Sequence, residues 1–170
     1  RQLVDDAVYM RVALVLDAHE GLDPAWRRAL GIPVIEVCTG HCGLDTPTIV
    51  RAMLPGVPFN RQGLIGVDLS DIRTVLSTGS RAWTTAVHSP PTEDGPSAIA
   101  RGFANLPPVR PTGVLAWANA GMDFSIKEFE VLRSAIQAEA ADEALCILAP
   151  LLDPDYAENE RLISLTLIGH

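Results

Sequence analysis

Two short segments of this sequence carry side chains whose types and spacing could do chemistry. The first contains Cys38, His41 and Cys42 within five residues, directly after an apolar run typical of a strand. Two thiols and an imidazole at this spacing can bind one soft metal ion such as zinc or nickel. Alternatively, Cys42 beside His41 acts as a low-pKa nucleophile, or Cys38 is a small core residue that ends its strand. The spacing leaves all three interpretations open.

The second segment contains Asp68 and Asp71, which follow the apolar run at residues 63–67. Paired carboxylates can position a water molecule for attack on a phosphate, or can bind a cation. The same spacing suits the start of a helix, because Asp68 can cap it and Asp71 would fall at its third position. There the helix dipole favours a negative charge. Spacing alone therefore favours the capping interpretation.

Composition and missing motifs argue against phosphate binding by this chain alone. The sequence lacks a G-x-x-x-x-G-K-[ST] loop, a G-x-G-x-x-G turn after a strand and a G-x-S-x-G elbow. Its net charge is −8, and Lys127 is the only lysine among 13 cationic residues. An anionic surface repels phosphate backbones. We therefore expect no nucleotide cofactor on this chain and no nucleic-acid partner.

Length and cysteine content indicate a cytoplasmic globular protein. At 18.2 kDa and 48% hydrophobic residues, the chain can bury a sizeable core without disulfides or metal. Its three cysteines cannot all pair within one chain, and reduced thiols are typical of a cytoplasm. No run approaches the ~18 apolar residues that a membrane span needs. The chain begins at Arg1 and not at methionine, which is consistent with a processed or truncated piece.

The elements that must position these residues alternate along the chain. Apolar runs predict strands at residues 8–16, 33–38, 82–87, 113–118, 144–149 and 162–168. Caps and spacing predict helices at 24–30, from 46, at 69–76 with Gly79 as cap, at 98–106, and after Ser125, where Glu128 completes a capping box. The first two strands with the helix between them suggest a βαβ-like unit. The sequence thus predicts an α/β fold, a mixed sheet with helices packed on it.

Four stretches in the second part of the chain resemble one known family. They read GLIGVDLSDIRTVLSTGSRAW, PSAIARGFANLPP, TGVLAWANAGMDFSIKEFEVLRSAI and ERLISLTLIGH. Their order and spacing resemble the C-terminal domain of the bacterial tubulin-like cell-division GTPase family FtsZ, over residues 62–170. The resemblance implies a tubulin/FtsZ C-terminal-domain-like fold for this part. Residues 1–61 do not follow that family's nucleotide-binding domain, and its GGGTGTG loop is absent from the sequence.

The resemblance also implies roles for Asp68 and Asp71. In that family the loop matching residues 63–71 reaches the nucleotide of the next subunit in a filament, and the two matching acids help to polarise the attacking water. Both acids would thus be catalytic only on a partner's nucleotide. Gly66 stands where the family usually has asparagine.

These observations lead to two hypotheses from different functional classes. We expect residues 1–61 to form a βαβ-like segment and residues 62–170 an FtsZ C-terminal-like domain. The leading hypothesis is a protein that binds no nucleotide itself and acts by self-association, or by association with a partner GTPase. The alternative is a metal-binding or thiol-dependent enzyme or metallochaperone centred on Cys38, His41 and Cys42, with zinc or nickel. A third possibility is that the fold serves an unrelated small-molecule reaction, because fold does not determine function.

Overall fold

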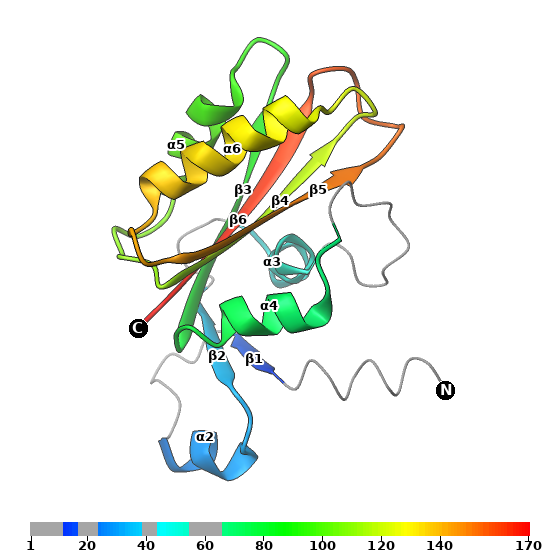
Figure 1. Cartoon of the computed structure of the whole chain (residues 1–170). Helices are drawn as coiled ribbons and strands as arrows, with labels where there is room; N and C mark the ends of the chain where they lie inside the picture. The colour runs from blue at the N-terminus through cyan, green and yellow to red at the C-terminus, as the bar shows by residue number, and fades with distance from the viewer. Residues whose placement is uncertain (1–11, 17–23, 39–43, 55–65) are drawn as a thin grey trace.

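The computed structural model describes residues 12–16, 24–38, 44–54 and 66–170. The described strands form one six-stranded sheet in the order β1-β2-β3-β6-β4-β5 (Figure 1). Along the chain the elements are β1 (Ala13–Leu16), α2 (Pro24–Leu30), β2 (Val34–Cys38), α3 (Thr46–Met53), α4 (Leu69–Leu76), β3 (Arg81–Ser89), α5 (Gly95–Ala104), β4 (Gly113–Ala120), α6 (Ile126–Glu139), β5 (Leu145–Leu152) and β6 (Arg161–Gly169). This is the mixed α/β fold that the sequence predicts.

The sheet is mixed because of one strand. β1, β2 and β3 pair in parallel, and β4 and β5 do the same. β6 lies antiparallel between β3 and β4, so it alone among the described strands runs against the others. Its register places Arg161 opposite Ser89, where β3 ends, and opposite Ala120, where β4 ends. The beginning of β6 therefore meets the ends of two other strands.

Helices cover both faces of the sheet: α5 and α6 lie on one face, and α3 and α4 on the other (Figure 1). All eight residues of β4 are buried, as expected of a strand covered on both sides. Ala116 packs in the cluster that contains Leu132 of α6. Its neighbour Leu115 packs in the cluster that contains Val75 of α4. Successive residues of β4 thus contribute to two separate cores.

One helix begins, and another ends, at a residue that differs from the prediction. α5 begins at Gly95 and not at residue 98, because Asp94 accepts a hydrogen bond from the Ser97 amide (2.7 Å) and caps the helix earlier. α4 ends at Leu76 with Ser77 as its C-cap. The prediction that Gly79 caps α4 is therefore wrong. Gly79 instead lies against the backbone of Gly169, at the end of β6.

The first part of the chain shares the sheet and a core with the second. β1 and β2 extend the sheet beyond β3. Trp117 of β4 donates a hydrogen bond from its indole nitrogen to the Met53 carbonyl of α3 (3.0 Å). The expected boundary between residues 61 and 62 lies outside the described residues.

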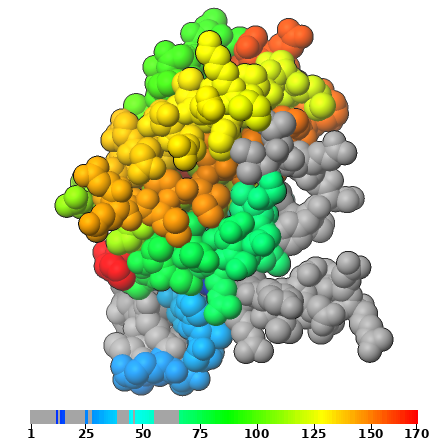
Figure 2. Space-filling model, viewed as in Figure 1, coloured from blue at the N-terminus to red at the C-terminus, as the bar shows by residue number. Residues whose placement is uncertain are grey.

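One edge of the described sheet is formed by β5, opposite the edge formed by β1. β5 is visible between α6 and α4 in the space-filling view (Figure 2). Pro150, which has no amide hydrogen to donate, occurs within this strand, as is typical of an edge. Across the described ranges, no helix is both long and apolar enough to cross a membrane.

Candidate functional site

Asp68 and Asp71 lie at the start of α4 and bond each other's backbone. Asp68 is the N-cap, and its Oδ1 accepts a hydrogen bond from the Asp71 amide (2.9 Å). The Asp71 Oδ2 accepts one from the Asp68 amide (3.0 Å). Burial of Ile72 and Val75 holds the helix on the sheet, while both carboxylates are exposed. The capping interpretation is confirmed, and each carboxylate commits one oxygen to it.

The direction of α4 decides which end of the sheet these acids face. The Thr112 hydroxyl donates to the Thr78 carbonyl (2.9 Å), so the end of α4 lies beside the beginning of β4. α4 therefore begins toward the end of the sheet at which β4 and β5 finish (Figure 1), and Asp68 is its N-cap. That same end carries the β4–α6 loop, residues 121–125. Two large apolar side chains are exposed in or next to this loop, Met122 (65%) and Ile126 (56%).

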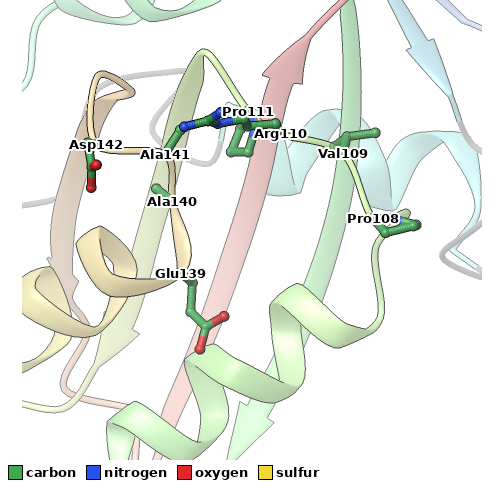
Figure 3. Close-up of a pocket in the computed structure, with 8 residues that line it drawn as sticks. All are labelled: Pro108, Val109, Arg110, Pro111, Glu139, Ala140, Ala141 and Asp142. Atoms are coloured by element: carbon green, nitrogen blue, oxygen red, sulfur yellow. The ribbon is translucent and has the colours of Figure 1, made fainter.

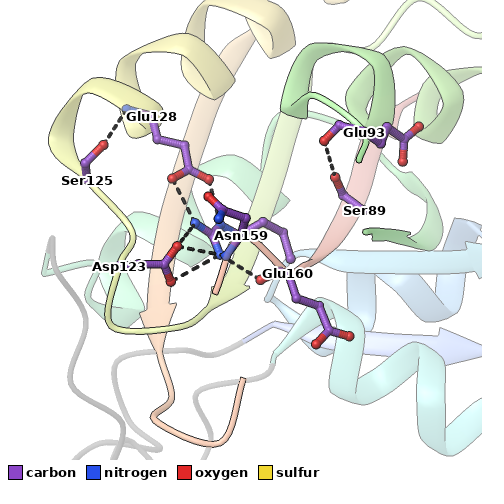
Figure 4. A network of polar contacts seen from close by, with 8 residues as sticks. Ser89, Glu93, Asp123, Ser125, Glu128, Asn159 and Glu160 are labelled. Atoms are coloured by element: carbon purple, nitrogen blue, oxygen red, sulfur yellow. Dashed lines mark hydrogen bonds and ion pairs between the residues drawn. The ribbon is translucent and has the colours of Figure 1, made fainter. Parts of the chain in front are cut away.

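A buried guanidinium, that of Arg161, binds Asp123 of this loop and Glu128 of α6, both of which Figure 4 labels. The Arg161 side chain is 4% exposed. Its Nε and Nη2 donate to the two carboxylate oxygens of Glu128 (2.6 and 3.0 Å), and Nη2 also donates to Asp123 Oδ2 (2.9 Å). Its Nη1 donates to the Glu160 carbonyl (2.8 Å). The Asn159 amide donates to Asp123 Oδ2 (2.9 Å). Arg161 thus joins the β4–α6 loop, the first turn of α6 and the β5–β6 loop.

Charge pairing in this network shifts the pKa of two members. Hydrogen bonds from Arg161 lower the pKa of Asp123. Burial alone would lower the pKa of Arg161, but hydrogen bonds to Glu128 and Asp123 outweigh it and raise that pKa. Asp123 and Arg161 therefore both carry their charges at neutral pH.

Sequence reasoning missed this cluster. It assigned Glu128 to a capping box with Ser125, and half of that prediction is confirmed, because the Ser125 hydroxyl accepts from the Glu128 amide (3.2 Å). The Glu128 carboxylate, however, binds Arg161 instead of the Ser125 backbone. The available signal was an arginine directly before the apolar run of β6, where a charged residue needs a partner.

The metal hypothesis has only one of its three residues in the described part of the chain. The Cys38 thiol, at the end of β2, accepts a hydrogen bond from Arg81 Nη2 (3.2 Å). His41 and Cys42 lie outside the described residues. Within the described ranges, no three His, Cys, Asp or Glu side chains come close enough to share a metal ion. Burial raises the pKa of the other described cysteine, Cys146, which makes it a poor nucleophile.

A hollow of about 480 Å³ opens at the opposite end of the sheet (Figure 3). It lies where α6 ends and before β4 begins. Pro108, Arg110, Pro111, Glu139 and Asp142 contribute to its wall. Its wall contains neither Asp68 nor Asp71, nor Met122 or Ile126 of the exposed loop. The hollow is thus separate from the end of the sheet described above.

Comparisons with known proteins agree on one relationship, although no protein-family model matches the chain. Cell division protein FtsZ of Coxiella burnetii is 36% identical over 109 residues, which cover 61% of this chain and 28% of that protein. FtsZ of Buchnera aphidicola subsp. Schizaphis graminum is 31% identical over 132 residues, or 67% of this chain and 32% of that protein. An empty FtsZ dimer of M. jannaschii has a TM-score of 0.69, with 17% identity, over 94% of this chain and 55% of that one.

The chain is therefore homologous to FtsZ over 61–67% of its length and has an FtsZ-like fold. It spans less than a third of the two curated relatives' lengths, 28% and 32%.

Proposed function

We propose that this chain provides an FtsZ C-terminal-type domain that binds no nucleotide itself and acts by association. It associates with a second copy or with an FtsZ-like GTPase, through the end of the sheet where β4 and β5 finish. Residues 62–170 form the FtsZ-like domain, and β1 and β2 extend its sheet. The protein acts in the cytoplasm, where its thiols stay reduced. This proposal rests on homology to FtsZ and on a solved FtsZ relative that is a dimer.

The observation that carries the proposal is the exposure of Met122 and Ile126 at that end. Each leaves more than half of its surface in water (65% and 56%), although both are large apolar side chains. Adjacent exposed apolar side chains with a polar rim are typical of protein interfaces. Asp68 and Asp71 begin α4, which covers the other face of the sheet from α6, so they are not part of this apolar pair (Figure 1).

The two acids have a second role if the partner holds a nucleotide. The capping box holds both carboxylates in one orientation, so a phosphate docked there would meet two fixed acceptors. Such acceptors can orient and polarise a water molecule for attack. Gly66 precedes them, and an added Cβ there would meet no atom of the described residues within 4 Å. We expect residue 66 to tolerate the asparagine that is usual in the FtsZ family.

Sedimentation velocity over a range of concentrations tests association of the 170-residue chain. We expect concentration-dependent growth of the species, and we expect Met122→Ser with Ile126→Ser to weaken association by at least about tenfold. Val131→Ser is the matched control, because Val131 is also exposed on α6 but lies beyond the loop. A wild-type chain that stays monomeric, both alone and mixed with C. burnetii FtsZ and GTP, would reject the proposal.

The action of Asp68 on a partner is tested by GTP hydrolysis in the same mixture. We expect the chain to change the GTPase rate of FtsZ, and Asp68→Asn to abolish the change. Asparagine still caps helices, so this variant removes the charge and keeps α4. Gly66→Asn should increase the effect of the wild-type chain. An Asp68→Asn variant that acts like wild type would reject the proposed role of the acids in hydrolysis. The proposed association would be unaffected.

A further inference from the structure

Burial of the Arg161 side chain, which joins two loops, is unfavourable in free energy. A guanidinium loses most of its hydration when it is buried, and two carboxylates must offset that loss. Replacement of such a triad by apolar groups is often neutral or stabilising. Stability alone therefore does not account for a side chain that is 4% exposed and makes ionic hydrogen bonds to Asp123 and Glu128. What the triad supplies is a defined geometry.

The two carboxylates lie close in sequence to the exposed apolar residues: they flank Ile126, and Met122 directly precedes the first of them. Asp123 directly follows Met122, and Glu128 comes two residues after Ile126. Between them, Phe124 is 5% exposed, and its ring centre lies 5.4 Å from the Arg161 guanidinium carbon. The Arg161 guanidinium thus contacts the segment 123–128 at both ends and at Phe124. Ile126 within this segment and Met122 directly before it are exposed.

The loop also approaches the β5–β6 connection too closely to accept a side chain at its first residue. A Cβ on Gly121 would lie 2.7 Å from Asp123 Oδ1 and 3.0 Å from the Tyr156 carbonyl. The Asn159 amide binds the same carboxylate from the β5–β6 connection. The Asp123 carboxylate is therefore held by two groups, the Arg161 guanidinium and the Asn159 amide.

We propose that Arg161 is the positioning residue of the association surface: it holds Met122 and Ile126 in the conformation that a partner recognises. The part of the inference that concerns a partner rests on the proposed function. The part that concerns the conformation of residues 121–128 does not depend on it. Preorganisation of this kind strengthens binding because the ordering cost is met before the partner arrives. Without Arg161 the segment would have to be ordered during binding.

The test uses a variant in which no buried charge is left without a partner. Arg161→Met, Asp123→Asn and Glu128→Gln together keep the size of each side chain and remove all three charges. Arg101→Met with Glu93→Gln is the control for loss of an ion pair at the surface, because Arg101 of the neighbouring helix α5 binds Glu93 (2.6 Å) but has a 44% exposed side chain. Circular dichroism confirms that both variants fold.

Hydrogen–deuterium exchange of the amides of residues 121–128 measures how firmly this segment is held in its conformation. In wild type the Phe124 amide donates to the Gly121 carbonyl (3.2 Å), and the Glu128 amide donates to Ser125 (3.2 Å). We expect exchange at least about tenfold faster in the triple variant and unchanged in the control. Unchanged exchange in the triple variant would overturn the inference, whether or not the wild type associates.

A double-mutant cycle then connects positioning to association. Ile126→Ala should weaken wild-type association by about tenfold, and by less than about twofold in the triple variant. Equal effects in both backgrounds would show that Arg161 does not act through Ile126, and would overturn the inference while the proposed function survives. Absence of wild-type association would instead reject the proposed function and the association half of the inference, and the exchange measurement would still decide the structural half.

Discussion

Asp68 and Ser125 each cap a helix, and an acid follows each of them by three residues. The carboxylates of these two acids bind different partners. Asp71 returns its carboxylate to the backbone of Asp68. Glu128 turns away from Ser125, because Arg161 offers it a charged partner. A charge-assisted bond to a buried guanidinium is stronger than a bond to one backbone amide. At the level of single residues, an available cation thus decides whether an acid completes a capping box.

Acids that accept hydrogen bonds from basic side chains make the stability of the protein depend on pH. Hydrogen bonds from Arg161 lower the pKa of Asp123, and a bond from His88 lowers the pKa of Glu160. A carboxyl with a depressed folded-state pKa stabilises the fold above its unfolded pKa. This contribution disappears as the pH falls through the folded pKa. We therefore expect the free energy of unfolding to decrease from about pH 5 toward about pH 2.

Urea unfolding of wild type and Asp123→Asn across this range checks the source of the decrease. The difference in unfolding free energy between the two proteins should be largest near neutral pH and should shrink as the pH falls. A difference that does not change with pH would contradict the assignment to Asp123.

Among the helices and strands, the turn between α4 and β3 illustrates how the elements are joined. The Ser80 amide donates to the Gly169 carbonyl (2.8 Å), and the Ser80 carbonyl accepts from the Glu36 amide (2.9 Å). Residues 77–80 therefore connect β2 with the end of β6. Gly79 lies so close to Gly169 that a Cβ would meet its carbonyl group. Backbone atoms, which cannot rotate away, exclude any larger residue.

We predict that Gly79→Ala destabilises the protein by about 1–3 kcal/mol, because the turn must move away from β6. Gly66→Ala is the matched control, since its added Cβ would meet nothing within 4 Å in the part of the chain that the structure describes. It should change the free energy of unfolding by less than about 0.5 kcal/mol. Urea unfolding compares the two, and equal effects would contradict the proposed clash.

Across the molecule as a whole, residues from both parts of the chain form one core. Ile35 of β2 and Met53 of α3 pack in the same cluster as Leu115 of β4 and Ile168 of β6. Each of these four side chains is fully buried. The helices that cover this face are α3, from the first part, and α4, from the second. Described residues from both sides of the expected division thus contribute to the same core.

We predict that the described parts unfold together. Met53→Ala should lower the free energy of unfolding by about 2–5 kcal/mol, because it removes a fully buried side chain. Tryptophan fluorescence and far-ultraviolet circular dichroism should still report one coincident urea transition. Two separate transitions, with only the first shifted by Met53→Ala, would show that residues 1–61 fold as their own domain.

Features that depend on neighbours along the chain could be predicted from the amino-acid sequence. The caps at Asp68 and Ser125 need only a side chain and an amide three residues away, and the strands from β2 onward need only an apolar run. The order of the homologous stretches likewise indicated the FtsZ-like fold.

Features that depend on residues far apart in the chain followed from tertiary packing alone. Packing inserted β6 between β3 and β4, and it paired Arg161 with Asp123 and Glu128, which are 38 and 33 residues away. It also left Ile126 exposed, although Ile126 continues the apolar spacing of Phe129 and Leu132. Helical spacing defines which side chains share a face, whereas burial requires another element to lie against that face.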